Sequence, residues 1–319
     1  MAEWLVEQGI GEERAILVER GEVLAARLRW PGGLEAGLVE DARLIARTAN
    51  SKRGTARFAS GEEALVDSLP HEASEGSTLR LMVTRSALAE RGRLKRAQAR
   101  PSQEAERPAP DLAQDLGARI VRRFPAGLWE DLFADACSGE AAFPGGGLTI
   151  TPTPAMTLVD VDGTLPPTAL ALEAVEPIAQ ALARLDLAGS IGIDFPTLTD
   201  KNDRKQVDGA LDCALGDWPH ERTAMNGFGF VQLVARLTRP SLLHLCAREP
   251  ARAAALFLLR QAEQVDAPGA LLLTCHPSVE EALKAEWQTE LARRSGREVR
   301  VAGNPALALG AAFAQAVPL

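Results

Sequence analysis

Two short apolar segments of this chain, residues 157–163 and 190–195, each carry an aspartate at or near their end. Between them, apolar residues recur at spacings of three and four from Leu172 to Leu185, which predicts a helix. A strand, a helix and a second strand of these lengths predict a right-handed crossover with parallel strands. Asp160 and Asp194 should then lie together at the carboxyl edge of one sheet.

Carboxylates that converge at such an edge can do chemistry, because open α/β sheets bind their ligands there. Asp160, Asp194 and the neighbouring Asp162 would repel one another unless a cation joins them. Ligation by oxygen alone favours Mg²⁺, with Mn²⁺ as the alternative. The competing interpretation is that each aspartate only terminates a strand and has no functional role.

Composition limits the classes of protein that this chain can be. Its 319 residues are 46% hydrophobic, enough for two to four subdomains, and its formal net charge of −8 argues against a protein that coats nucleic acid. The sequence has no apolar run that would span a bilayer and no leader pattern, so we expect a cytoplasmic protein. The cysteines are scattered without metal-ligand spacing, which argues against zinc. A local basic stretch could still meet a bound partner: Arg85, Arg91, Arg93, Lys95, Arg96 and Arg100.

The segments around these aspartates suggest an order of elements. Short strands are expected in residues 1–37, and further short strands with turns between them in 38–100 suit a small barrel of the OB type. Residues 101–110 form a Pro-rich linker. Helical periodicity then runs over 112–137. Later expected elements are helices at 204–215, 251–264 and 279–293, and strands at 270–274 and 299–301.

The run Asp160-Val-Asp-Gly-Thr-Leu resembles the signature of haloacid dehalogenase-type phosphatases. In that resemblance Asp160 is the nucleophile of a phosphomonoester hydrolase. The late acidic motif of that family has no candidate, because no aspartate occurs after Asp266.

A second resemblance continues in order along the chain, to the ribonuclease E/G endoribonucleases. The first similar segment is a P-x-G-G turn followed by a strand, which leads into the strand that carries Asp160. A later similar segment is the strand that ends on Asp194. The similar segments are 143–150, 155–162, 187–195, 222–228, 237–246 and 275–284.

This resemblance implies an α/β fold, in detail an α+β chain of several subdomains. It places a ribonuclease-H-like part in 1–37 with 111–147, an OB-type RNA-binding barrel in 38–100 and a linker in 101–110. A catalytic nuclease domain is expected in 148–246 and a small C-terminal domain in 247–319.

The resemblance also assigns roles to individual residues. It makes Asp160 and Asp194 the catalytic Mg²⁺ ligands, with Asp162 as a third metal ligand and RNA contact where an asparagine is usual. Arg222 would meet an RNA phosphate, Phe58 would stack on a base, and Lys95 would lie near the scissile strand. Leu65 stands where a second stacking aromatic is expected, which should weaken stacking.

Three departures point to a reduced member of that family. The segment before Pro144 is too short for a sensor of 5′-monophosphate ends, and the loop after Asp162 is shortened. The paired cysteines of a zinc-linked dimer are absent after Cys246, so we expect a monomer or a dimer through another interface. The expected function is Mg²⁺-dependent hydrolysis of single-stranded RNA to 5′-phosphate and 3′-hydroxyl ends. The alternatives are the phosphatase and a non-catalytic RNA-binding relative.

Overall fold

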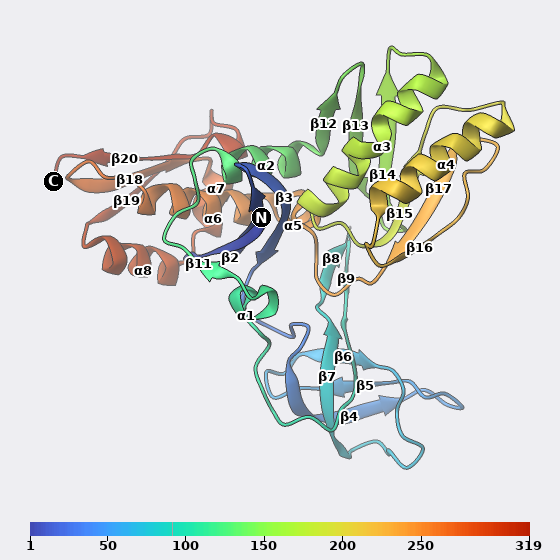
Figure 1. Cartoon of the computed structure of the whole chain (residues 1–319). Helices are drawn as coiled ribbons and strands as arrows, with labels where there is room; N and C mark the ends of the chain where they lie inside the picture. Colours follow the sequence, from blue (N-terminus) through green and yellow to red (C-terminus); the bar gives the residue numbers. More distant parts are fainter. Residues whose placement is uncertain (91) are drawn as a thin grey trace.

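A computed structural model describes residues 1–90 and 92–319 of the chain, so Arg91 of the basic stretch lies outside the described residues. The fold is mixed α/β, with several sheets and one closed barrel, as expected for an α+β chain of several domains. Figure 1 shows three parts that extend from a small N-terminal sheet: the barrel, a six-stranded sheet with its helices, and the C-terminal sheet with its helices. No helix in the described part of the chain is long and apolar enough to cross a membrane.

The N-terminal sheet is an antiparallel meander to which a later segment returns. Strand β11 pairs in parallel with β1 after the chain has completed the barrel, in the order that an inserted barrel requires. Its strands, in the order β11-β1-β2-β3, are β1 (Glu3–Gln8), β2 (Glu13–Glu19), β3 (Glu22–Arg29) and β11 (Arg119–Ile120).

The helix expected over 112–137 is wrong as one element. It is two helices, α1 (Leu112–Leu116) and α2 (Leu128–Ser138), with β11 between them. Gly117 ends α1 in a left-handed conformation (φ 58°), which glycine adopts without steric cost. The apolar periodicity runs across both helices, but the backbone turn at Gly117 interrupts the hydrogen-bond ladder.

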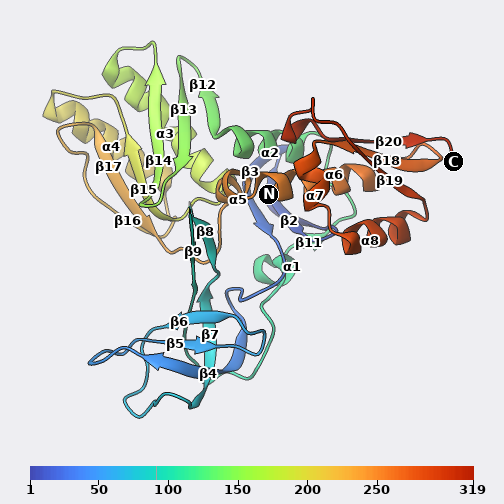
Figure 2. The ribbon, with the colours of Figure 1, turned by 180° about the vertical axis from the view of Figure 1, so that it is seen from behind.

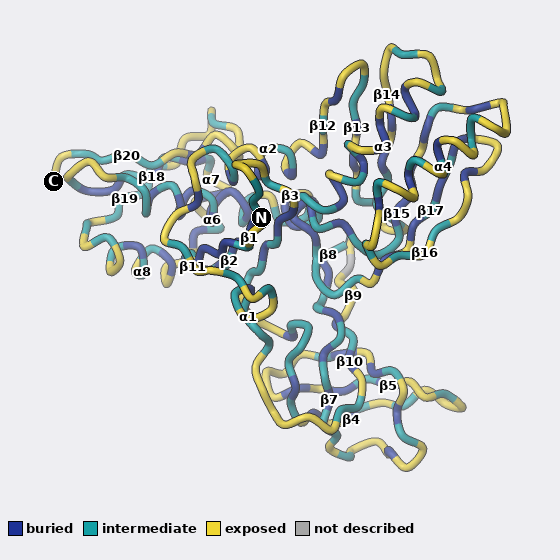
Figure 3. The backbone as a smooth tube through the Cα atoms, viewed as in Figure 1, coloured by how far each residue is buried: buried dark blue, intermediate teal, exposed yellow. Residues whose placement is uncertain are grey.

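The barrel is closed and its strands lie over the residues predicted for it. The order is β10-β6-β5-β4-β7, and its interior includes Leu44, Phe58 and Leu81. Figure 3 shows buried positions on these strands and exposed positions on the loops between them. The strands are β4 (Val39–Arg47), β5 (Gly54–Arg57), β6 (Glu63–Val66), β7 (Thr78–Arg85) and β10 (Ala97–Pro101).

A hairpin of β8 (Leu88–Glu90) and β9 (Arg93–Lys95) extends from the barrel towards the rest of the chain. Its Ala89 carbonyl lies 2.6 Å from Nε2 of His244 in α5 (Leu242–Arg248). The Ser86 N–H donates to the Thr238 carbonyl. The hairpin therefore connects the barrel to the segment that follows the six-stranded sheet.

The six-stranded sheet carries the aspartates. Strands β14 and β15 are parallel and joined by α3, as the crossover predicts, while their other neighbours are antiparallel. Residues 140–143, expected in the ribonuclease-H-like part, form β12 of this sheet instead. In order, the strands are β12 (Glu140–Phe143), β13 (Gly146–Pro152), β14 (Thr157–Gly163), β15 (Gly189–Asp194), β17 (Phe230–Ala235) and β16 (His220–Arg222).

Helices cover one face of this sheet. Helix α3 (Pro167–Arg184) packs on β12, β13 and β14 and contacts α4 (Lys201–Leu215). Both helices lie in front of the strands in Figure 1, and the strands face the viewer when the molecule is seen from behind in Figure 2. Val159, Val161 and Ile193 bury their side chains in the core on the helix side.

The C-terminal part is the expected βαβ-like unit with one added strand. Strands β18 and β19 are parallel, and β20 pairs antiparallel with β18. The helix expected over 279–293 is wrong as one element, because Leu283 and Lys284 are extended and separate two helices that bury Val279 and Trp287 in the same cluster. The elements are α6 (Pro250–Glu263), β18 (Ala270–Cys275), α7 (Pro277–Ala282), α8 (Ala285–Ser295), β19 (Val299–Gly303), a 3₁₀ turn (Leu309–Ala311) and β20 (Phe313–Val317).

Candidate active site

Asp160 and Asp194 lie directly opposite each other on the two parallel strands. The pairing continues on both sides, because Thr149 on β13 is opposite Asp160 and Phe230 on β17 is opposite Asp194. These residues form one row across four neighbouring strands. Asp194 ends β15, as predicted, but Asp160 lies inside β14, which continues to Gly163. The site is therefore on the face of the sheet as well as at its edge.

Strand alternation turns the carboxylates away from the core. Val159 and Val161 are buried beside α3, so Asp160 and Asp162 point to the opposite face, where both are exposed. Asp194 is exposed after the buried Ile193. The sequence predicted this grouping from strand order alone, and the structure brings all three aspartates to one side of the sheet.

The carboxylates of Asp162 and Asp194 affect the electrostatics of Asp160. Partial burial raises the pKa of Asp160, and the negative charges of Asp162 and Asp194 raise it further, against a backbone hydrogen bond at Val161. Repulsion from these two charges disfavours the ionised form of Asp160. A divalent cation between the carboxylates would remove this repulsion, and the donor atoms are all oxygens, which suits Mg²⁺.

The predicted three-ligand metal site is not formed. Within residues 1–90 and 92–319, no group of three or more His, Cys, Asp or Glu side chains is arranged to hold a metal ion. Mg²⁺ usually keeps several waters and binds through one or two carboxylates together with substrate phosphates. The pair Asp160 and Asp194 fits that mode, with Asp162 as a nearby charge instead of a third ligand.

Arg222 does not present a free guanidinium to RNA. Its side chain is 16% exposed and pairs with Asp208 at 2.8 Å and with Asp212 at 3.2 Å. Although partial burial opposes the charge, hydrogen bonds to these two carboxylates raise the pKa of Arg222. Its hydrogen bonds join α4 to β16, so the structure gives it a positioning role instead of the predicted phosphate contact.

The barrel residues predicted to hold RNA differ in exposure. Phe58 is 3% exposed in the barrel core, which leaves no ring face for a base and does not support a stacking role. Leu65 is exposed, and Lys95 is exposed but 3.9 Å from Glu90 across the β8–β9 hairpin. Arg85 of the basic stretch is buried and donates to the Arg96 carbonyl, because β7 turns its side chain inwards. Of the two side chains predicted to hold RNA here, Lys95 is exposed and Phe58 is not.

A hydrogen-bonded turn beside Asp194 was given no role by the sequence analysis. It joins β16 to β17 and carries Phe228, whose side chain is 80% exposed. The Asn226 side-chain oxygen accepts hydrogen bonds from the N–H groups of Phe228 and Phe230. The signal in the sequence was Asn-Gly-Phe-Gly, a turn pattern that holds an aromatic residue between two glycines.

Replacing Gly229 should damage this turn. Gly229 has φ 89°, and an added Cβ would lie 2.4 Å from the Phe195 carbonyl oxygen. We expect Gly229→Ala to lower the free energy of unfolding by about 1–3 kcal/mol, because neither the backbone angle nor the carbonyl can adjust cheaply. The matched control is Gly227→Ala, where an added Cβ would meet nothing within 4 Å. Equal denaturant midpoints for the two variants would contradict this account of the turn.

Comparison with known proteins finds similarity to Ribonuclease G over part of the chain. No family model matches the chain. The chain is 34% identical over 119 residues to Ribonuclease G of Escherichia coli (strain K12), and the same identity is found with Ribonuclease G of Shigella flexneri and of Salmonella typhimurium (strain SL1344). Each match covers 33% of this chain and 24% of the relative, so the chain spans about a quarter of the length of these curated relatives. This similarity supports a relationship to proteins of the ribonuclease E/G type over that part.

Proposed function

We propose that this chain is a Mg²⁺-dependent endoribonuclease that hydrolyses single-stranded RNA to 5′-phosphate and 3′-hydroxyl ends. The observation that supports it most is the pairing of Asp160 with Asp194 on an exposed sheet face. The partial similarity to Ribonuclease G supports the choice of RNA as substrate. An exposed face also suits a polymer that passes across it better than a small molecule that must be enclosed.

In this proposal the chain's own residues position the ion and the phosphate. Asp160 and Asp194 would hold Mg²⁺, and their strands fix the two carboxylates because Val159, Val161 and Ile193 anchor the other side of the sheet. When bound, Mg²⁺ supplies charge neutralisation at the phosphate and makes a water molecule more acidic. Asp162 contributes negative charge beside the pair and disfavours an approach of the RNA backbone without the ion.

The phosphatase alternative receives less support from the fold. A nucleophilic aspartate of that type is expected at the end of a strand in a parallel sheet, whereas β14 continues beyond Asp160 and is antiparallel to β13. The non-catalytic RNA-binding relative would need the metal pair to serve no purpose. The placement of two like-charged carboxylates opposite each other on adjacent strands favours the enzyme, because a bound cation would relieve their repulsion.

Removal of the metal tests the proposal directly. The purified chain should cut an end-labelled, unstructured RNA at internal positions in Mg²⁺, and EDTA should reduce cutting to background. Excess Mg²⁺ should restore it, and the new ends should carry 5′-phosphate. RNA that is bound but never cut would support the binding protein, and release of phosphate from a small phosphomonoester without RNA cleavage would support the phosphatase. Either result would overturn the endoribonuclease.

A further inference from the structure

We propose that Phe228 stacks on a nucleobase next to the scissile phosphate, an inference that rests on the proposed function and names the contact that holds single-stranded RNA over Asp160 and Asp194. Among the large apolar side chains that the structure describes, only the terminal Met1 and Leu319 are more exposed than Phe228. Its ring therefore contributes little to the core and has a face available for a ligand.

The turn that carries Phe228 is held in place by hydrogen bonds on both sides. Asn226 and Phe230 bond through their backbones, and the Asn226 side chain holds the Phe228 N–H at 2.8 Å. The Met225 N–H donates to the carboxylate of Asp208. The Phe228 carbonyl accepts from the Thr197 hydroxyl at 3.4 Å. An exposed aromatic ring on a fixed backbone loses little conformational entropy when it binds.

The turn is also anchored to the strand end that carries Asp194. The Phe195 N–H donates to the Gly229 carbonyl, and Phe230 is the cross-strand partner of Asp194. Opposite residues have Cα atoms about 5 Å apart, and two further residues span at most about 7 Å. The Phe228 Cα therefore lies within roughly 12 Å of the Asp194 Cα.

The charges around the site favour stacking over ionic contact. Asp160, Asp162 and Asp194 make this face negative, and the nearby Arg222 is already neutralised by Asp208 and Asp212. Of these four side chains, the three aspartates repel a phosphate and the single arginine is already paired. Stacking on an aromatic ring needs no charge and accepts every base, because each base has a π-face. The contact should hold RNA with little sequence preference.

The first test compares Phe228→Ala, Phe228→Leu and Phe228→Trp in RNA cleavage. We expect Phe228→Ala and Phe228→Leu to raise KM about 5- to 100-fold with kcat almost unchanged, because stacking is worth about 1–3 kcal/mol per base. Phe228→Trp should retain the wild-type KM. The matched control is Phe313→Ala, the same substitution at an exposed phenylalanine of β20 in another sheet. Wild-type KM in Phe228→Ala would overturn the inference, as would full rescue by leucine, which has no π-face.

The second test locates the base and does not depend on cleavage. The Asp194→Asn chain is bound in Mg²⁺ to an RNA that carries one abasic nucleotide, placed in turn on either side of the mapped cut. One position should weaken binding as much as Phe228→Ala does, and combining the two changes should add no further loss. If the wild type does not cut RNA, the abasic nucleotide is placed in turn at every position of the oligonucleotide and binding is measured for each. Absence of cleavage then tests the proposed function, and the binding series tests stacking by Phe228. Additive losses at every position would overturn stacking and indicate that Phe228 meets a protein partner or nothing.

Discussion

If the proposed function is right, Asp194→Asn should lose RNA cleavage by about 10³-fold or more while the chain stays folded, because the substitution removes a charge that the proposal places beside the ion at the scissile phosphate. Asp160→Asn should have an effect of the same size, since the two carboxylates are opposite each other on β14 and β15. The measurement is the single-turnover rate on a labelled single-stranded RNA in saturating Mg²⁺.

Stability separates loss of chemistry from loss of fold in these variants. Partial burial raises the pKa of Asp160, and the charges of Asp162 and Asp194 raise it further. Removing one charge should therefore leave the thermal midpoint in EDTA unchanged or slightly higher. Mg²⁺ should raise the midpoint of the wild type and have much less effect on either variant.

Asp162→Asn is the matched control for the site. Asp162 lies on the same exposed face, and its substitution by asparagine is the same chemical change. In the proposed function, however, it does not belong to the pair that holds the ion. Asp162→Asn should retain cleavage activity within about tenfold of wild type. Loss of a contact made in the transition state would reduce activity by more than that. Full cleavage by both Asp160→Asn and Asp194→Asn would remove the metal pair from the mechanism. A loss in Asp162→Asn as large as theirs would restore the three-ligand site.

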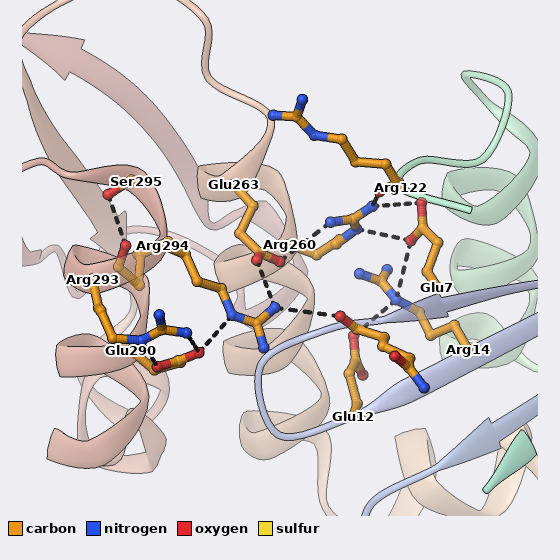
Figure 4. A network of polar contacts seen from close by, with 12 residues as sticks. Glu7, Glu12, Arg14, Arg122, Arg260, Glu263, Glu290, Arg293, Arg294 and Ser295 are labelled. Carbon is orange, nitrogen blue, oxygen red and sulfur yellow. Dashed lines mark hydrogen bonds and ion pairs between the residues drawn. The ribbon is translucent and has the colours of Figure 1, made fainter. Parts of the chain in front are cut away.

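Glu7→Gln should be strongly destabilising, although it changes the shape of the side chain very little. Glu7 on β1 is buried and lies 2.6 Å from Arg260 of α6 and 3.9 Å from Arg14 of β2. Figure 4 shows the network continuing from Arg260 to Glu263 and from there to Arg294 of α8. It joins the N-terminal sheet to the C-terminal part of the chain.

The size of the effect follows from burial. Arg14 and Glu12 are only 1% and 5% exposed, and this burial lowers the pKa of Arg14 and raises that of Glu12. Glu7→Gln keeps the shape and the hydrogen bond from the Phe124 N–H, but leaves two buried guanidinium groups with less compensation. Breaking a buried pair in this way costs about 3–5 kcal/mol. Equilibrium unfolding in urea measures the change.

The control for this prediction is Glu298→Gln, which removes an exposed pair with Arg300 and should hardly move the midpoint. The double variant Glu7→Gln with Arg260→Met should be less destabilised than the sum of the single variants, because the two residues contact each other. A Glu7→Gln chain as stable as wild type would mean that the network contributes nothing to holding the two parts together.

Local patterns carried much of the architecture and the centre of the site. Two apolar runs, a helical repeat and two aspartates sufficed to place Asp160 and Asp194 together, because a short crossover constrains strands to be parallel. A small barrel likewise follows from short strands and turns between residues 39 and 101, but its closure is seen only in the structure. The effect of a single glycine on where a helix ends was harder to predict from the sequence. The turn at Gly117 divides a run of periodic residues whose spacing fits one helix.

The sequence by itself determined which residues could do chemistry and which strands bring them together. Both depend on residues that are close to one another in the chain. Only the tertiary structure decided which side chains are free to act. Phe58 is turned into the barrel core, Arg222 is neutralised by α4, and Phe228 is left exposed beside Asp194. Glu7 meets Arg260 across 253 residues of sequence. Burial and ion pairing arise from contacts between distant segments, and such contacts have no local signature.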